Sequence, residues 1–369
     1  MNTLLTHNLS ETDIGKPLIQ SPLAIQTLDQ VGATAWDDFL DHTEGSLPTQ
    51  TSAWESILSR TYGLSCHFLA AQQDGKIQGV LPLYRVKSIL MGDSLQSMSG
   101  AVCAATPQAA QALYYAADEL ADRLKVDYLL LRDSRQVWDG CGLEVIEAHR
   151  GVRLHLPADR DSAWENLHKR LRKDFRYGNN KGIVSSIVCC TMVDEFYEFF
   201  LRFNHQMGTP CFSEQFMLDV TSAFPGRFST ALGFNDDKPV AGVFCLIHRN
   251  KAFGIWGGSL HEFNPMMPTH RVYWAIIEDA IQQGYDQFDI GRSPYPSSQF
   301  EFKARWCDET YPIFQLFRIY HGKLPPTLNL NQAVQTKGKV SLASKVWPKL
   351  PLPMVRTLGP VVRRHIPFG

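Results

Sequence analysis

An internal repeat limits the chain to folds built from two similar units. Residues 114–134 and 273–293 align without gaps at an offset of 159, and six of the 21 aligned positions are identical. Each copy begins with the apolar spacing of a helix and ends in a short apolar stretch typical of a strand. Self-similarity at a fixed offset indicates repeated structural units. We therefore expect a helix followed by a strand at both places.

A predicted hairpin precedes each copy of the repeat. Residues 68–84 and 230–248 each contain two apolar runs separated by a polar turn, at 74–76 and 236–238, an offset of 162. Polar turn residues between alternating apolar runs mark a β-hairpin. The order strand, turn, strand, helix, strand thus occurs twice. A tandem duplication is the interpretation that we adopt.

The repeat suggests how the chain divides. The boundary is expected near Arg150-Gly151, before the strand-like segment 152–156. We predict a disordered N-terminus at residues 1–22 and a first GNAT-like domain at 23–150. A second domain, which carries the site, is predicted at 151–325, and a basic tail with prolines at 326–369. The fold class is α+β (α/β) with mixed central sheets. This element order is compatible with the GNAT acyltransferase fold, although ferredoxin-like units share it.

Composition argues against several kinds of protein. The 369 residues include 36 basic and 37 acidic side chains, and this balance disfavours a general nucleic-acid binder, so no DNA partner is expected. No apolar run is long enough to span a membrane, and the N-terminus lacks the pattern of a secretory signal. The eight cysteines include no C-x-x-C pair, and this usage is typical of a protein in the reducing cytoplasm and not of a disulfide-bonded or zinc-binding scaffold. We expect a cytoplasmic protein without a bound metal.

The charge is unevenly distributed. Residues 310–369 carry nine basic residues and no carboxylate, whereas residues 1–309 carry 27 basic and 37 acidic residues. Segments 346–353 and 358–364 mix basic and apolar residues, which suits the surface of an anionic membrane. The alternative is a solvated tail that packs a few apolar residues on the body. The prolines are expected to prevent one long amphipathic helix.

A series of motifs follows one another through the second half. They are Leu171-Arg172-Lys173-Asp174-Phe175-Arg176 with Lys181-Gly182-Ile183, Met207-Gly208-Thr209-Pro210, Gly257-Gly258, Tyr273-Trp274, Phe288-Asp289-Ile290-Gly291-Arg292-Ser293 and Phe302-Lys303-x-x-Trp306. In order and spacing they resemble FemAB-type (peptidoglycan-bridge-type) transferases of the GNAT superfamily. The tail at 347–360 resembles the branch associated with exosortase (PEP-CTERM) and exopolysaccharide loci.

This resemblance implies two tandem GNAT-like (acyl-CoA N-acyltransferase) domains. It also implies transfer of an acyl or aminoacyl group to an amine of a cell-envelope or exopolysaccharide precursor, which could be lipid- or nucleotide-linked, at the inner face of the membrane. No cofactor is expected beyond the acyl donor, which is either aminoacyl-tRNA or acyl-CoA. The chain lacks the Q/R-x-x-G-x-G/A loop that holds coenzyme A in ordinary GNAT enzymes.

The chain also departs from the family pattern. Where relatives have a glycine-rich stretch, residues 293–300 contain two prolines, which fix φ and remove N–H donors. Thr269-His270 replaces the Asn-Asp usual in the branch, and the charged helical hairpin of bridge-forming relatives is missing. Two alternatives therefore stay open. One is an acyl-CoA-dependent N-acyltransferase, and the other is a non-catalytic assembly subunit of a polysaccharide-synthesis system.

Four residues are predicted to carry the chemistry. Acyl transfer to an amine needs donors that stabilise an oxyanion and a group that handles one proton. Lys303 and Arg292 are the candidates for the oxyanion or for a phosphate, and Asp289 and His270 for the proton. Strand alternation places Asp289 and Arg292 on opposite faces, so both face one cleft only if the strand contains a bulge. A surface lysine, a salt bridge and a helix-terminal histidine are the structural alternatives.

Six further residues are candidates for substrate binding. Arg172 and Arg176 lie four apart, on one face of a predicted helix, and could hold a diphosphate. Gly257 and Gly258 end an apolar stretch and could let a ligand approach the backbone closely. The aromatic candidates are Tyr273 and Trp306. A solvated helix face, a plain turn and core packing are the respective alternatives.

Overall fold

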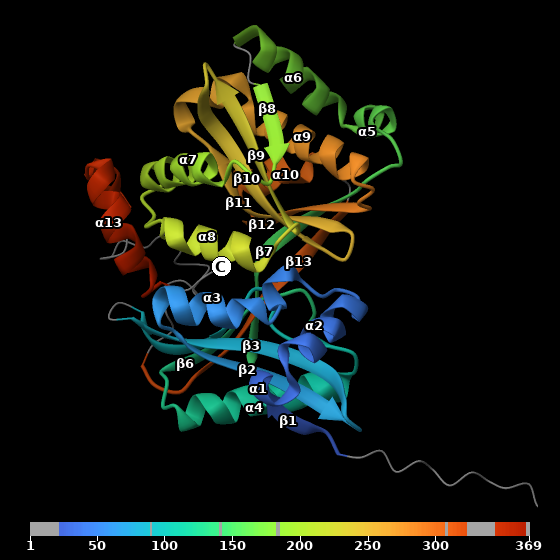
Figure 1. The fold of residues 1–369 in the computed structure, drawn as a ribbon, viewed down its shortest axis with the longest axis vertical. Helices are drawn as coiled ribbons and strands as arrows, with labels where there is room; N and C mark the ends of the chain where they lie inside the picture. The colour runs from blue at the N-terminus through green and yellow to red at the C-terminus, as the bar shows by residue number, and fades with distance from the viewer. Residues whose placement is uncertain are drawn as a thin grey trace, which may run out of the picture.

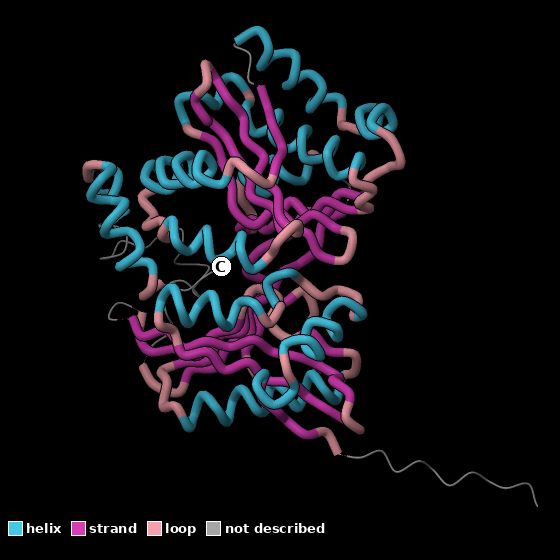
Figure 2. The backbone as a smooth tube through the Cα atoms, viewed as in Figure 1, coloured by secondary structure: helices cyan, strands magenta, loops and turns pink. Residues whose placement is uncertain are grey.

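One mixed β-sheet runs through both halves of the molecule. The computed structural model describes residues 22–88, 91–139, 142–181, 185–306, 309–322 and 344–366. Within these residues the strand order is β1-β2-β3-β4-β6-β13-β7-β12-β11-β10-β9-β8, and β5 pairs with β3. The halves lie one above the other in Figure 1, and Figure 2 shows helices on both sides of the strands in each half.

The elements follow the predicted duplication. The first half contains β1 (Ala24–Thr27), α1 (Leu28–Val31), α2 (Ala33–His42), η1 (Pro48–Gln50), α3 (Ala53–Tyr62), β2 (Ser65–Gln73), β3 (Lys76–Ser88), β4 (Gly92–Ser97), β5 (Cys103–Ala104), α4 (Pro107–Arg123) and β6 (Tyr128–Ser134). The second half contains β7 (Glu144–His155), α5 (Arg160–Asn166), α6 (Lys169–Lys181), β8 (Ser185–Cys189), α7 (Val193–Gln206), α8 (Glu214–Ala223), β9 (Phe228–Asn235), β10 (Lys238–His248), β11 (Lys251–Ser259), η2 (His261–Met266), α9 (Pro268–Gln282), β12 (Gln287–Pro294) and α10 (Ser298–Ala304). The chain then continues with β13 (Glu309–Ile319), η3 (Trp347–Lys349) and α13 (Leu352–Arg363).

Both predicted hairpins form, and both turn in the same way. Strands β2 and β3 are antiparallel, as are β9 and β10. Asp74 and Gly75 have φ of 50° and 74°, and Asp236 and Asp237 have φ of 47° and 60°. Two consecutive positive φ angles form a type I′ turn, whose twist matches that of the paired strands. Short Asp side chains tolerate this conformation better than most L-residues.

The helix and the strand that follow each hairpin also match. Helix α4 leads into β6, and α9 leads into β12. Strand β6 lies parallel to β4, and β12 lies parallel to β11. A parallel neighbour needs a crossover connection, and α4 and α9 provide it. The tandem arrangement predicted from the repeat is therefore confirmed.

The halves are joined by exchanged strands. Strand β13 comes from the end of the second half but pairs with β6 of the first, and its other edge pairs with β7. Strand β7 in turn pairs with β12. The boundary near Arg150-Gly151 falls inside β7, and the domain division stays a prediction. Continuous pairing across the junction restricts movement of one half against the other.

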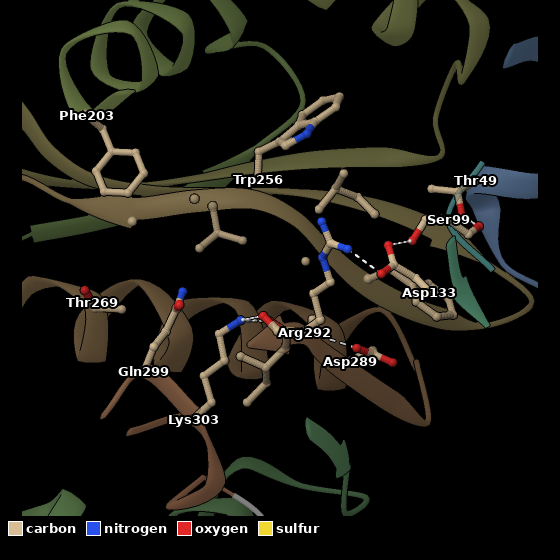
Figure 3. Close-up of a pocket in the computed structure, with 18 of the residues that line it drawn as sticks. Thr49, Ser99, Asp133, Phe203, Trp256, Thr269, Asp289, Arg292, Gln299 and Lys303 are labelled. Carbon is tan, nitrogen blue, oxygen red and sulfur yellow. Dashed lines mark hydrogen bonds and ion pairs between the residues drawn. The ribbon is translucent and has the colours of Figure 1, made fainter. Parts of the chain in front are cut away.

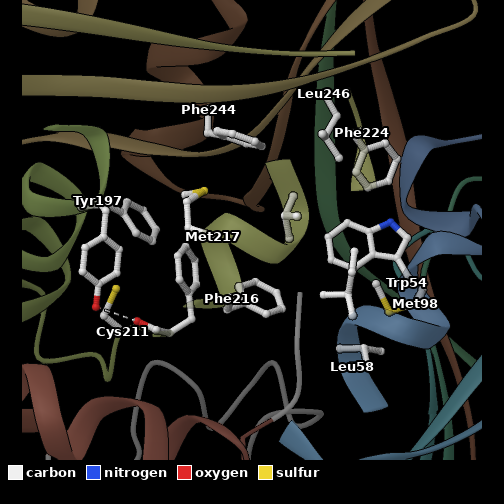
Figure 4. Packing of buried hydrophobic residues seen from close by; sticks show 14 of the residues in the cluster. Trp54, Leu58, Met98, Tyr197, Cys211, Phe216, Met217, Phe224, Phe244 and Leu246 are labelled. Atoms are coloured by element: carbon white, nitrogen blue, oxygen red, sulfur yellow. Dashed lines mark hydrogen bonds between the residues drawn. The ribbon is translucent and has the colours of Figure 1, made fainter. Parts of the chain in front are cut away.

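A hydrophobic cluster packs the halves together. Helix α3 of the first half lies against α8 of the second, and Trp54 and Phe216 meet between them with ring centroids 6.3 Å apart. Figure 4 shows Trp54, Leu58 and Met98 on one side and Phe216, Phe224 and Phe244 on the other. Burial of large aromatic side chains contributes about 2–3 kcal/mol each, so this junction is a core and not a loose contact.

The C-terminal segment forms a helix in spite of its prolines. Helix α13 has 12 residues and runs through Pro360, whereas Leu350 and Pro351 separate it from η3, so the described tail contains a short helix and not one long helix. Pro353 stands in the first turn, where its missing N–H costs little, and Pro360 stands in the last. No helix among the residues described has the length and apolarity to cross a membrane. Most of the predicted N-terminal segment, residues 326–343 of the tail and the motif pair Gly182-Ile183 lie outside the described residues.

Candidate active site

A cavity of about 700 Å³ lies where β11 and β12 separate. The two parallel strands pair only from Lys251 to Phe253 and from Gln287 to Asp289. Beyond that point Gly254 to Ser259 of β11 and Ile290 to Arg292 of β12 line opposite parts of the cavity. Strands that pair and then diverge leave backbone N–H and C=O groups without a neighbouring strand. These groups can bind a ligand in the space between.

A bulge in β12 brings Asp289 and Arg292 to the same cavity. The register with β7 shifts between Asp289 and Gly291, and Gly291 has φ of 82°. A Cβ at position 291 would lie 2.8 Å from the carbonyl oxygen of Gly254. Glycine is therefore required both by the backbone angle and by the neighbouring strand. Strand alternation predicted that Asp289 and Arg292 could face one cleft only if the strand contained a bulge, and this bulge is present.

Lys303 binds the backbone of the bulge in β12. Its Nζ donates hydrogen bonds to the carbonyl oxygens of Ile290 at 3.0 Å and Arg292 at 2.9 Å, as Figure 3 shows. The side chain comes from the last turn of α10 and is 8% exposed. Burial lowers the pKa of Lys303 to about 8, against the raising effect of Asp289. An ammonium group has three N–H donors, so one can serve a group in the cavity.

Arg292 forms an ion pair across the junction of the halves. Its Nη1 donates to Oδ1 of Asp133 on β6, and Ser99 Oγ donates to Oδ2 of the same carboxylate at 2.8 Å (Figure 3). Asp133 is 3% exposed. Burial would raise the pKa of Asp133, but the charges of Arg292 and Arg132 outweigh it and lower this pKa to about 2. Arg292 and Lys303 both line the cavity, and we refer to the part of the cavity that they line as the β12 end.

The carboxylate of Asp289 has three partners. Arg135 forms an ion pair with Oδ2 at 2.9 Å, the Tyr311 hydroxyl donates to Oδ2 at 2.6 Å, and the Gly291 N–H donates to Oδ1 at 2.9 Å. These contacts favour a structural role for Asp289, because each partner stabilises its ionised carboxylate. The role of base stays a prediction. Burial and the Asp289 charge raise the pKa of Tyr311.

His270 and Trp306 lie in the core of the second half. The His270 ring packs on Phe302 and Trp306 with centroids 5.1 and 5.9 Å apart. Burial lowers the pKa of His270 to about 4, although Asp174 at 3.7 Å acts in the other direction. Neither His270 nor Trp306 is among the described residues that line the cavity. Their predicted roles in catalysis and binding therefore lack a geometric basis.

The paired glycines and Tyr273 line the cavity wall. A Cβ at Gly257 would lie 2.5 Å from the carbonyl oxygen of Gly242 on β10, and one at Gly258 would lie 2.3 Å from the Phe203 ring. Both glycines thus have a packing reason, in addition to a possible ligand contact. Tyr273 is buried, and burial raises the pKa of its hydroxyl.

Arg172 and Arg176 are apart from this cavity. Both lie on α6, where Arg176 is exposed and Arg172 is partly buried. The inner face of that helix is formed by Leu171, Phe175 and Gly178. The two arginines share a helix, as predicted, but the structure does not bring them to Lys303.

Sequence reasoning missed several cavity residues. Asp133 and Arg135 come from the first repeat and from the loop after it, and Arg363 comes from the tail. One signal was present, because Asp133 aligns with Arg292 at the offset of the repeat. Among the residues that the structure describes, no group of three or more His, Cys, Asp or Glu side chains could hold a metal ion.

Comparison with known proteins identifies the second half. Residues 165–304 match the family described as the acetyltransferase (GNAT) domain. The match covers 140 of the 369 residues, all of them in the second half. This match supports the predicted acyltransferase class. No sequence of a curated protein matches the chain.

Three solved structures resemble the whole molecule. The crystal structure of FemX has a TM-score of 0.59 at 14% identity, with 79% of this chain and 96% of that chain covered. The C-terminal domain of a putative lysylphosphatidylglycerol synthetase from Agrobacterium fabrum has a TM-score of 0.53 at 12% identity, with 82% and 95% covered. A tandem GNAT protein of the clavulanic acid biosynthesis pathway has a TM-score of 0.52 at 10% identity, with 82% and 99% covered. At such identities the likeness concerns the fold, and it confirms the predicted tandem GNAT architecture.

Proposed function

We propose that the protein transfers an acyl or aminoacyl group to an amine of a cell-envelope or exopolysaccharide precursor. The observation that carries this proposal is the position of Lys303 and Arg292 at the point where β11 and β12 diverge. Cationic donors are fixed there beside unpaired strand backbone. Asp133 and Ser99 also line the cavity, where Asp133 accepts a hydrogen bond from Arg292 and Ser99 donates one to Asp133.

The geometry suits attack of an amine on an ester or thioester carbonyl. The new bond joins nitrogen to the carbonyl carbon, the carbon–oxygen or carbon–sulfur bond of the donor breaks, and the proton that the amine loses ends on the departing oxygen or sulfur, which leaves as an alcohol or a thiol. Charge develops on the carbonyl oxygen, and donors fixed in advance stabilise it by about 3 kcal/mol each. Lys303 can supply such a donor, and with a pKa of about 8 it can also exchange a proton near neutral pH.

Two observations bear on the substrates. FemX and a putative lysylphosphatidylglycerol synthetase, the second of which is named for an aminoacylated lipid, are similar to this chain in fold. The sequence motifs resemble the exosortase-associated branch of the FemAB-like proteins. We therefore propose an exopolysaccharide precursor as acceptor, and aminoacyl-tRNA or acyl-CoA as donor. Of these two donors, the match to an acetyltransferase family supports acyl-CoA.

We further propose that α13 attaches the protein to the inner face of an anionic membrane. Its outer face exposes Met354, Leu358 and Val361, at the spacing of one helix face. Residues 344–366 contain five basic residues and no acid. Sedimentation with phosphatidylglycerol vesicles should be lost in Leu358→Glu. Equal sedimentation of the variant would contradict the proposal.

The experiment that tests the activity is mass spectrometry of the envelope polymer from cells with and without the protein. We expect an acyl or aminoacyl substituent that disappears with the protein and with Lys303→Met, while circular dichroism shows that the variant is still folded. Lys76→Met removes an exposed lysine from the β2–β3 hairpin and should leave the modification intact. An unmodified polymer in all strains would support an assembly subunit instead.

Donor identity needs a separate measurement. Acetyl-CoA should bind the purified protein and protect Lys303 from amine-reactive labelling if the donor is a coenzyme A thioester. Binding of aminoacyl-tRNA without binding of acetyl-CoA would point to the other donor. Both measurements use the complete chain.

A further inference from the structure

The bulge in β12 is held by two side chains. Nζ of Lys303 donates to the carbonyl oxygens of Ile290 and Arg292. These residues flank Gly291, whose N–H donates to Oδ1 of Asp289 at 2.9 Å. Figure 3 shows Lys303 and Asp289 beside this short stretch of backbone. The position of the Lys303 ammonium group therefore depends on backbone that Asp289 helps to hold.

Tyr311 reaches Asp289 from two strands away. Strand β7 lies between β13, which carries Tyr311, and β12, which carries Asp289. Tyr311 is opposite Gly151 of β7, and its hydroxyl group donates to Oδ2 of Asp289 at 2.6 Å. A Cβ at Gly151 would lie 2.1 Å from Cζ of the Tyr311 ring. Only glycine at this position of β7 leaves room for the ring to cross the strand.

Two arginines pack on the ring of Tyr311. The guanidinium carbon atoms of Arg135 and Arg153 lie 4.7 and 4.6 Å from the ring centroid. Cations are attracted to the face of an aromatic ring. Arg135 also forms the ion pair with Asp289, whose side chain is 2% exposed. One guanidinium group thus contacts both the ring and the carboxylate, and a charge-assisted hydrogen bond joins the ring to the carboxylate.

This network extends over both halves of the molecule. Arg135 follows β6 of the first half, whereas Tyr311 stands on β13 and Asp289 on β12. Strand β13 pairs with β6 of the first half and with β7 of the second. The exchange of β13 between the halves therefore places the Tyr311 hydroxyl group at the Asp289 carboxylate.

Asp289 also acts on Lys303 through its charge. Among the described residues, the charged groups that face Lys303 are Asp289 and Arg292. Burial lowers the pKa of Lys303 to about 8, and the Asp289 charge opposes this effect whereas the Arg292 charge adds to it. A carboxylate that moved away from the bulge would lower this pKa further. The position and the protonation of Lys303 both depend on where Asp289 is held.

We propose that Tyr311 is a positioning residue that keeps Asp289 on the bulge and thereby keeps the Lys303 ammonium group at the β12 end. The inference rests on the proposed function in one respect, namely that Lys303 serves the acyl transfer. Tyr311 is not among the described residues that line the cavity, so it acts through Asp289 and not on a substrate.

Amine-reactive labelling of the complete chain tests this inference without an acyl donor or acceptor. Trace acetic anhydride labels lysines that have lost their proton, and mass spectrometry measures Lys303 relative to Lys76, the exposed lysine of the β2–β3 hairpin. Asp289→Asn removes the charge itself, and Tyr311→Phe keeps the ring and removes only the hydroxyl group. We expect both variants to move the midpoint of Lys303 labelling to lower pH. A shift of one pKa unit raises the labelling at neutral pH about tenfold.

Tyr320→Phe is the matched control. Tyr320 directly follows β13, and its hydroxyl group donates to the carboxylate of Asp118 on α4. Neither residue is among the described residues that line the cavity. This variant loses a hydrogen bond of the same kind, so it should lose stability but keep the wild-type midpoint of Lys303. Gly151→Ala, which displaces the Tyr311 ring, should move the midpoint, and circular dichroism would show that each variant is folded.

Two results would overturn the inference. One is a wild-type midpoint in Tyr311→Phe, which needs no displacement of backbone and decides the question even if Gly151→Ala does not fold. The other is an equal shift in Tyr311→Phe and Tyr320→Phe, which would indicate a general loosening around β13. A shift confined to Tyr311→Phe, in a protein that modifies no polymer in cells, would support the inference and contradict the proposed function instead.

Discussion

Arg292 donates a hydrogen bond to Asp133, and these two residues occupy equivalent positions in the two copies of the repeat, 159 residues apart. A duplication that placed the same residue at both positions would bring two like charges together. The chain instead has opposite charges, and the pair links β6 to β12 across the junction. The ion pair is therefore both part of the cavity and part of what joins the halves.

Removal of Arg292 should destabilise the protein. Arg292→Ala leaves the Asp133 carboxylate buried without its main counter-charge, and breaking a buried pair in this way costs about 3–5 kcal/mol. Denaturant unfolding of the variant would measure the loss. Arg150→Ala breaks the half-exposed pair with Glu147 and should cost less than about 1 kcal/mol. Equal losses in the two variants would contradict the importance of the Arg292–Asp133 pair.

The bulge at Gly291 should tolerate no side chain. Gly291→Ala places a Cβ 2.8 Å from the carbonyl oxygen of Gly254 and strains a φ of 82°. Gly284→Ala is the matched control, because Gly284 has φ of 75° and an added Cβ there would meet no atom within 4 Å. We expect about 1–2 kcal/mol of strain in both variants and a further loss only at position 291. Urea unfolding would compare them, and similar midpoints would argue against the close approach of β11.

The repeat made the architecture predictable, because it shows in the spacing of apolar residues and turn residues. The turns at Asp74 and Asp236 and the strands β6 and β12, each of which follows a helix, could be predicted from local sequence. The exchange of β13 between the halves does not, since pairing of distant strands leaves no mark on local periodicity. The continuous sheet could therefore be recognised only in three dimensions.

The candidate site could be predicted in part. Lys303 and Arg292 were found from the motifs, and strand alternation correctly named a bulge as the condition for Asp289 and Arg292 to share a cleft. The packing of His270 among aromatic rings could not be predicted, because a polar residue near a helix start gives no sign of it, and its role as a base stays a prediction. Arg363 was missed because a basic tail resembles a solvated one until its helix is packed.

The activity should depend on the charge of Lys303. With a pKa of about 8, this lysine loses its proton as the pH rises past 8, and an uncharged amine is a weaker donor to an oxyanion. Acyl-transfer rates should therefore fall about tenfold per pH unit above pH 8. Lys303→Arg stays protonated and should retain a lower rate without this decline. A rate that rises through pH 8 would instead indicate that Lys303 acts as a base.

Acid should destabilise the fold through its buried histidines. Burial lowers the pKa of His248 and of His270 to about 4, against 6.5 in the unfolded chain. Between pH 6.5 and pH 4 the unfolded chain binds more protons, so the free energy of unfolding falls as the pH falls, by up to about 1.4 kcal/mol per pH unit for each histidine. Replacing one of them should reduce this slope.

His270→Phe is the replacement that the structure favours. Neither ring nitrogen of His270 has a hydrogen-bond partner within 3.5 Å, although Asp174 lies 3.7 Å from Nε2, and the ring packs on Phe175, Phe302 and Trp306. Phenylalanine keeps the aromatic contacts and removes two buried polar atoms, whereas His248→Phe would lose the 2.8 Å hydrogen bond to Ser46. We expect His270→Phe to be more stable than wild type at pH 5 and His248→Phe to be less stable at pH 7. Unfolding curves between pH 4 and pH 7 measure both, and an unchanged pH slope in His270→Phe would show that His270 is not enclosed as described.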